Sequence, residues 1–148
     1  MGVDRAERTV EIGGPPAACF DAVVDFESYP AWQSLVKESV VHERDDQGRG
    51  IVVETLVEAK IRTFRYTLRY AYDEPTHVTW DLVEGDVRSI EGEYVFEPSG
   101  GKTVATYRLA VDLGRFGRMV PGEMKRKATE HLMKTTITEL KARVESDE

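Results

Sequence analysis

From Val36 to Leu113 the chain alternates apolar and polar residues with a period of two, in runs separated by short turn-forming segments. Such alternation is typical of strands that bury one face. The breaks are rich in Gly, Pro and Asp, which suit tight turns, and connections this short favour antiparallel neighbours. The pattern predicts strands at 36–44, 51–59, 63–73, 77–84, 89–97 and 103–113.

The region before this alternation combines one strand with helical signals. Val10 and Ile12 alternate with polar neighbours, which predicts a first strand at 7–12. Two glycines and two prolines end it, and proline suits the first turn of a helix because its missing N–H would be unpaired there. The apolar spacing that follows predicts a helix over 16–25, and a second short helix is expected to begin at Pro30.

The last part of the chain, residues 121–145, has the period of a long amphipathic helix. Pro121 is placed like a first-turn residue, and a helix of this length extends about 36 Å, enough to cross a sheet. Its apolar stripe consists of Met124, Ala128, Leu132, Met133, Ile137, Leu140 and Val144. This order of elements predicts one α+β domain over residues 1–148 with the helix-grip fold. In this fold a curved antiparallel sheet of about seven strands has two short helices after its first strand, and a long C-terminal helix closes a cavity against the sheet.

One face of the predicted sheet is apolar and aromatic, and the other is charged. On the strand at 63–73, for example, Phe64 and Tyr66 alternate with Arg65. Ligand sites have apolar walls with a few polar groups, and a buried tyrosine hydroxyl needs a partner, which a bound oxygen can supply. The alternative is that these rings simply fill a core. The residues expected to line the cavity are Phe64, Tyr66, Tyr70, Trp80, Leu82, Tyr94, Tyr107, Leu109, Met133 and Ile137.

Two segments are candidates for the cavity mouth. Trp32, close to Pro30, is expected where the short helices meet the edge of the sheet, either as a gate or as ordinary packing of the helix corner. The segment 114–120 has two glycines that can act as hinges, with Phe116 and Met119 as covers for the opening. The alternative for this segment is a plain connection between a strand and a helix.

The chain resembles the START/Bet v 1-like (SRPBCC) superfamily, in the bacterial polyketide cyclase/dehydrase and lipid-transport branch near the coenzyme-Q-binding group. The resemblance covers nearly the whole chain. It is carried by the segment Asp-Phe-Glu-Ser-Tyr-Pro-Ala-Trp at 25–32, the strands at 77–85 and 92–98, and the closing helix with Leu140-Lys141. Membership implies a cavity between sheet and helix that holds sterols, quinones, polyketides or other hydrophobic molecules. A shared fold does not by itself specify a reaction.

Signals for catalysis are few. The three histidines, His42, His77 and His131, lie on separate elements without a metal-type spacing, so neither a metal site nor a cofactor is expected. The sequence has no nucleophile elbow, phosphate-binding loop or dinucleotide fingerprint. Arg62 is in phase with the aromatic face and can point inward at the end of a strand, where a cyclase would use a charged group to polarise carbonyls.

Three functions therefore stay open, in order of preference. The first is binding, with or without transport, of a hydrophobic small molecule such as a lipid, quinone or polyketide-like compound. The second is a polyketide cyclase/dehydrase, an enzyme of the aromatase/cyclase type. The third is a protein-interaction module, which would show a cavity too small for ligands and a large exposed apolar patch instead.

Composition narrows the possible partners and location. A net charge of −7 argues against nucleic acid, because phosphate binding needs clustered Lys and Arg. The single cysteine, Cys19, fits a reducing compartment, and no apolar run is long enough to cross a membrane. With no sign of a signal peptide or stable membrane insertion, we expect a cytoplasmic protein. Nothing in the pattern indicates the oligomeric state.

Overall fold

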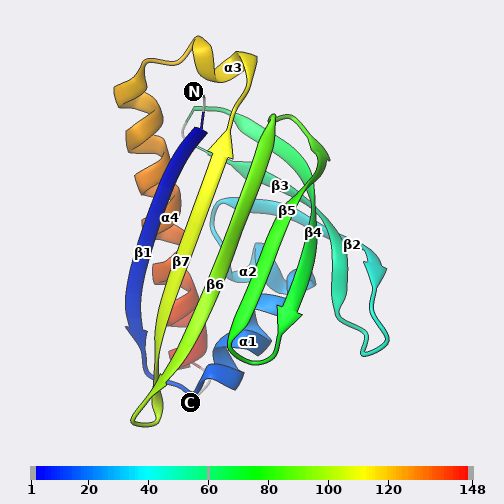
Figure 1. Ribbon diagram of the computed structural model, residues 1–148, viewed down its shortest axis with the longest axis vertical. Coiled ribbons are helices and arrows are strands. Elements are labelled where there is room, and N and C mark those ends of the chain that lie inside the picture. Colours follow the sequence, from blue (N-terminus) through cyan, green and yellow to red (C-terminus); the bar gives the residue numbers. More distant parts are fainter. Residues whose placement is uncertain (1–2, 60, 147–148) are drawn as a thin grey trace.

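A computed structural model describes residues 3–59 and 61–146 of the chain. Its centre is an antiparallel seven-stranded sheet in the order β1-β7-β6-β5-β4-β3-β2 (Figure 1). The strands are β1 (Val3–Ile12), β2 (Val36–Arg44), β3 (Gly50–Glu58), β4 (Thr63–Asp73), β5 (His77–Gly85), β6 (Ser89–Ser99) and β7 (Lys102–Asp112). The predicted α+β helix-grip fold is confirmed, and from β2 to β7 the strand ends differ from the predicted ones by at most one or two residues.

The helices agree with the prediction in order, with two differences. They are α1 (Pro16–Val24), the 3₁₀ turn η1 (Phe26–Ser28), α2 (Tyr29–Trp32), α3 (Arg115–Arg118) and α4 (Gly122–Ser146). The η1 turn was not predicted. The segment at 114–120, expected to be either a hinged cover of the cavity mouth or a plain connection, contains the one-turn helix α3.

Strand β1 is longer than predicted, because it begins at Val3 and pairs with β7 along its whole length, from Val3 opposite Asp112 to Ile12 opposite Thr103. Its first half is rich in charged residues and does not alternate, so periodicity could not reveal it. β1 lies at the edge of the sheet, where charged side chains are common because they discourage further strand pairing.

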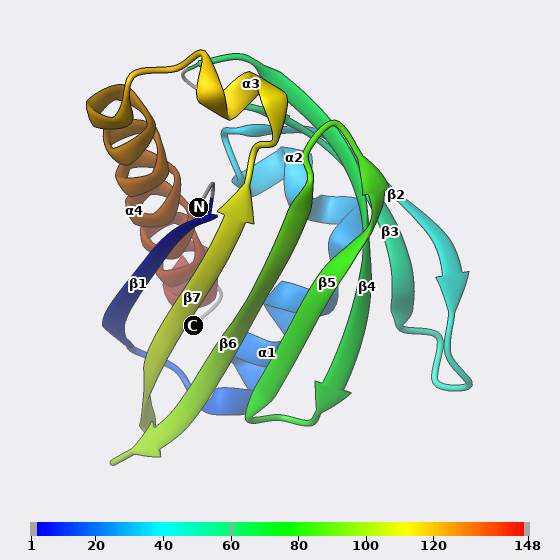
Figure 2. The ribbon, with the colours of Figure 1, turned by 45° about the horizontal axis from the view of Figure 1, so that its top comes forward.

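The sheet bends around α4. Register shifts interrupt the pairing of β2 with β3, and that of β4 with β5 between Thr67 and Leu68; such bulges bend and twist a sheet. Figure 2 shows α4 and the two helices after β1 on the same side of the sheet. The end of α4 is tied to the end of β1, because the Gly13 N–H donates to Glu145 Oε2 at 2.8 Å and Lys141 Nζ donates to the Glu11 carbonyl at 2.8 Å.

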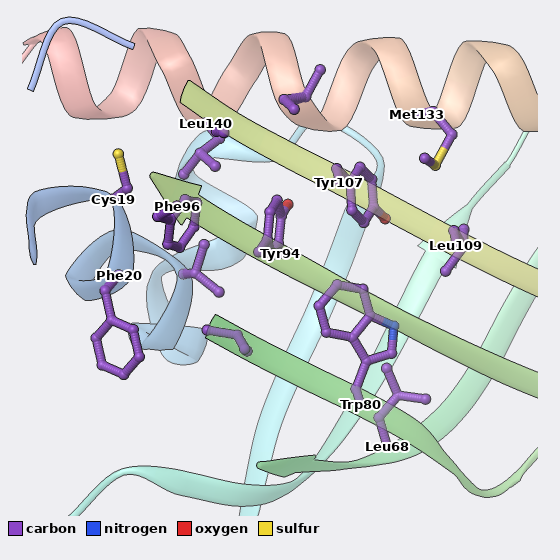
Figure 3. Close-up of a cluster of buried hydrophobic side chains, with 14 of the residues drawn as sticks. Cys19, Phe20, Leu68, Trp80, Tyr94, Phe96, Tyr107, Leu109, Met133 and Leu140 are labelled. Carbon is purple, nitrogen blue, oxygen red and sulfur yellow. The ribbon is translucent and has the colours of Figure 1, made fainter. Parts of the chain in front are cut away.

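The interior is closely filled at the end where α1 lies. Phe20 and Cys19 from α1 meet Phe96 of β6 and Leu140 of α4 in one cluster, and all four are almost completely buried. Figure 3 shows this cluster beside α1 and, further along the sheet, the rings of Tyr94, Tyr107 and Trp80. Packing at the α1 end therefore holds α4 on the sheet. The shape of the interior further along the sheet depends on the rings of Tyr94, Tyr107 and Trp80.

The outer face of the sheet carries two similar networks of charge. In one, His77 Nε2 lies 2.6 Å from Glu93 Oε1, and Arg108 donates to the other Glu93 oxygen at 2.7 Å. In the other, His42 and Arg65 bind the two oxygens of Glu54 at 2.7 and 2.8 Å. These contacts hold neighbouring strands in register on the solvated side. Among the described residues, no helix has the length and apolar character needed to cross a membrane.

Candidate functional site

A cavity of about 150 Å³ lies between the aromatic face of the sheet and α4. Its floor is built by alternate residues of β4 to β7, because a strand presents every second side chain to the same face. Its roof is the part of α4 that carries Ala128, Leu132 and Thr136. The hollow therefore forms where the sheet curves away from the helix, beyond the filled cluster at α1.

Most of the residues that the sequence predicts for the cavity lie in its wall. They are Phe64, Tyr66, Tyr70, Trp80, Tyr94, Tyr107 and Leu109. Leu82, Met133 and Ile137 do not line it: Leu82 is half-buried against the core, and the two α4 residues are buried within the core cluster. The apolar stripe of α4 is broader than the cavity, so Leu132 and Thr136 face the hollow while the neighbouring pair packs beside it.

The tyrosine hydroxyls divide into two groups. Those of Tyr29 and Tyr72 donate to the backbone carbonyls of Val23 and Gly50. By contrast, no hydrogen bond joins the hydroxyls of Tyr66, Tyr70 and Tyr94 to any residue within 3–59 and 61–146, nor are these oxygens among the fully enclosed unpaired atoms. They border the hollow and are open to a guest.

Burial makes these phenols even harder to ionise than a free tyrosine, which is already protonated at neutral pH. Desolvation raises the pKa of Tyr66, Tyr70 and Tyr94 above the ordinary value of a tyrosine, because the phenolate would lose its hydration. Burial likewise raises the pKa of Tyr107, whose hydroxyl contacts Thr136 of α4. The sheet side of the cavity is therefore uncharged and offers O–H donors to an oxygen acceptor.

The position of Trp80 depends on a glycine. Trp80 of β5 lies opposite Gly92 of β6, and a Cβ on that glycine would come within 2.4 Å of the indole ring. The indole therefore lies across β6, where its centroid is 5.5 Å from the ring of Tyr94 and 5.9 Å from that of Tyr107 (Figure 3). The ring cluster sets the depth of the cavity floor.

None of the three residues predicted for the mouth belongs to the cavity lining, but Phe116 and Trp32 each pack against a residue of the wall. The Phe116 ring packs edge-on against Phe64 at 6.0 Å, and the Arg62 guanidinium lies 5.0 and 5.1 Å from the two ring centroids. Arg62 thus covers the wall from outside and does not point into the cavity. Met119 is 76% exposed, and Trp32 packs against Tyr29 with its ring centroid 5.5 Å away.

Several polar lining residues were not predicted. Gln33, Thr55 and Thr136 are buried and face the hollow. Thr55 was recognisable in principle, since it alternates in phase with the buried Val53 and Val57 on β3. The charged side chains that the described residues contribute to the wall are engaged: Asp4 lies 3.9 Å from Lys125, and Glu139 accepts the Ser34 N–H at 3.0 Å.

The three histidines lie away from the cavity wall. His42 and His77 are bound to carboxylates on the outer face, and His131 is not part of the wall. In the portion of the chain that the structure describes, no three His, Cys, Asp or Glu side chains are grouped so that they could hold a metal ion. The middle of the hollow is a neutral, donor-bearing aromatic surface, suited to binding a neutral oxygenated ring.

Comparison with known protein families identifies the family to which this chain belongs. A model of the family described as "Polyketide cyclase / dehydrase and lipid transport" matches residues 4–145. That description does not single out a coenzyme-Q-binding group. No curated protein matches the chain.

Solved structures with the same fold cover almost all of the chain. A START superfamily protein from Mycobacterium smegmatis is 24% identical, with a TM-score of 0.86 over 97% of this chain and 99% of its own. A protein from Thermus thermophilus is 23% identical, with a TM-score of 0.82 over 98% of both chains. The Zhui aromatase/cyclase from Streptomyces sp. R1128 is 15% identical, with a TM-score of 0.81 over 97% of this chain and 94% of its own. These likenesses establish the START/Bet v 1-like fold.

Proposed function

Because this chain belongs to the polyketide cyclase/dehydrase and lipid transport family, we propose that it binds a hydrophobic small molecule between its sheet and α4. The ligand is an apolar compound with at least one oxygen acceptor, a class that includes lipids, quinones and polyketide-like molecules. One observation supports this above all: the hydroxyls of Tyr66, Tyr70 and Tyr94 border the hollow without a protein partner among the described residues.

The energetics of such a site follow from its lining. Apolar burial contributes roughly 25 cal/mol per Å² of ligand surface removed from water. A phenol that donates to a ligand oxygen adds about 0.5–1.5 kcal/mol, and it also orients the guest. Because the tyrosines stay protonated, they recognise acceptors such as carbonyls, so the site selects for oxygenated rings over pure hydrocarbons.

The volume limits the size of the guest. Sites for drug-sized ligands measure about 300–1,000 Å³, whereas this cavity measures about 150 Å³. An engineered apolar cavity of about 150 Å³ in another protein binds benzene. The enclosed part of the ligand is therefore one or two rings in size, and a larger ligand extends past the wall.

The test compares two guests of the same skeleton, tetralone and tetralin, which differ in one carbonyl. Binding of both is measured by quenching of Trp80 fluorescence in a Trp32→Phe background. Tyr94→Phe is expected to weaken tetralone about 2- to 12-fold, the equivalent of one hydrogen bond, and to leave tetralin unchanged. Tyr72→Phe is the matched control, because its hydroxyl is already bound to the Gly50 carbonyl. Failure of both guests to bind would refute the proposal.

A second candidate function is cyclisation or dehydration of a poly-ketone. It is favoured by the protonated phenols, since several donors at one hollow can polarise a carbonyl for ring closure. Among the described residues, the two carboxylates of the wall, Asp4 and Glu139, are engaged with Lys125 and the Ser34 N–H, and no imidazole belongs to the wall; for that reason binding is preferred. Turnover of a linear diketone to a cyclohexenone, lost in Tyr94→Phe without weaker binding, would establish the enzyme; no turnover above the solution rate would exclude this reaction.

A further inference from the structure

A second hollow adjoins the cavity at the end of the molecule that carries α3. It is a groove of about 600 Å³ where the start of β1 and the end of β7 meet α3 and the start of α4. Its wall includes Arg88, Arg118 and Lys125, with Val120 and Asp112. Figure 1 shows these segments together at the top of the molecule.

The groove is cationic, although the chain has a net charge of −7. Among the described residues of its wall, three side chains are basic and one is acidic. The acidic one, Asp112, is already engaged, since it accepts the Gly114 N–H at 2.9 Å and lies 3.9 Å from Arg88. Arg118 is exposed and forms no ion pair with any residue in 3–59 or 61–146. The groove thus has positive charge to spare for a ligand.

Lys125 belongs to the walls of both hollows. It lies 3.9 Å from Asp4, and both side chains are only partly exposed, at 18% and 28%. Asp4 lies opposite Val111 of β7, which lines the cavity between the buried Leu109 and the half-buried Leu113. The apolar cavity wall and the basic groove therefore meet at Lys125.

We propose that the ligand is an anionic amphiphile, with its apolar ring portion in the tyrosine cavity and its carboxylate, phosphate or sulfonate in this groove. Arg88 and Arg118 hold the anion as hydrogen-bond donors, and Lys125 lies at the junction. This inference rests on the proposed function for the apolar portion. It also accounts for the small enclosed volume, because only the tail of the ligand has to fit inside.

The experiment uses two fluorescent probes that share an apolar body, phenylnaphthylamine and its sulfonated counterpart anilinonaphthalene sulfonate. The wild-type protein is expected to bind the sulfonate at least about tenfold more tightly at low salt, the effect of one hydrogen bond to a charged group. Arg118→Ala and Arg88→Ala are expected to remove this preference and leave phenylnaphthylamine unchanged. Arg115→Ala is the control, because Arg115 belongs to the same short helix but not to the groove wall.

The outcomes separate the two proposals. If the wild-type protein binds both probes with equal affinity, or if Arg115→Ala and Arg118→Ala lower the affinity for the sulfonate equally, the groove is not the anion site. The proposed binding function is unaffected by either result. Binding of neither probe overturns the binding function itself. Leu132→Trp places a larger side chain at the cavity roof and is expected to lower the affinity for both probes by the same factor. If this variant does not change the affinity for the sulfonate, the sulfonate binds in the groove alone. That result would contradict a ligand that spans both hollows.

Discussion

Replacing Gly92 by alanine tests the geometry of the cavity floor directly. The new methyl group would lie 2.4 Å from the Trp80 indole, a separation that real Cβ atoms do not show, so the ring must move. The backbone itself accepts alanine, because Gly92 is not among the glycines with positive φ. The whole effect therefore comes from the side-chain contact.

The expected cost is that of overpacking a core. Inserting a methyl group into a well-packed site costs typically about 1–3 kcal/mol, and alanine recovers up to roughly 1 kcal/mol of backbone entropy relative to glycine. The net loss is up to about 2.5 kcal/mol in the free energy of unfolding. For a domain of this size it lowers the melting temperature by up to about 10 °C.

The assay is urea denaturation followed by circular dichroism, combined with the fluorescence of Trp80. Gly122→Ala is the control, because no atom lies within 4 Å of the added Cβ and alanine favours the helix. In a Trp80→Leu background the clash is absent, so Gly92→Ala should become neutral or slightly stabilising there. An equal loss in both backgrounds would show that the indole does not lie over Gly92.

Three further predictions concern the rest of the fold. Tyr29→Phe leaves the Val23 carbonyl without its donor and should lower the free energy of unfolding, measured by chemical denaturation, by about 1–3 kcal/mol. The Tyr70 hydroxyl has no protein partner among the described residues, so Tyr70→Phe should cost less than about 0.5 kcal/mol. Equal losses would contradict the division of the hydroxyls into two groups. The hydrogen bond from His77 lowers the pKa of Glu93, so its stabilising effect is present above the unfolded value of about 4.3 and is lost as the pH falls through the lower folded value. Glu93→Gln should therefore lower the urea midpoint at neutral pH but not in strong acid, and a pH-independent difference would speak against the ion pair. Phe96→Ala, at a fully buried position, should destabilise the protein by about 3–5 kcal/mol, and a loss below about 1 kcal/mol would place Phe96 outside the core.

Much of the fold was predictable because the strands alternate cleanly. The row of inward aromatic residues on β4 and on β6 identified the cavity floor, and short connections implied the antiparallel order of the sheet. The first half of β1 escaped prediction because an edge strand is held by pairing with β7 and not by burial.

The sequence did not predict correctly which residues of α4 form the roof of the cavity. Adjacent positions on α4 differ by about 100° around the helix axis, and an apolar stripe as broad as this one does not show which edge faces the hollow. The structure turns Leu132 and Thr136 inward and packs Met133 and Ile137 beside them. Similarly, the inward phase of Arg62 did not reveal that its guanidinium stacks over the Phe64 and Phe116 rings at the outside.

The most direct test of the account is a crystal structure of the protein under xenon pressure. Xenon binds in apolar cavities and does not bind where side chains fill the core. The account predicts a xenon site between the Trp80 indole and Leu132 of α4, close to the ring of Tyr94. Continuous side-chain density across that space, with xenon bound only elsewhere or not at all, would contradict it.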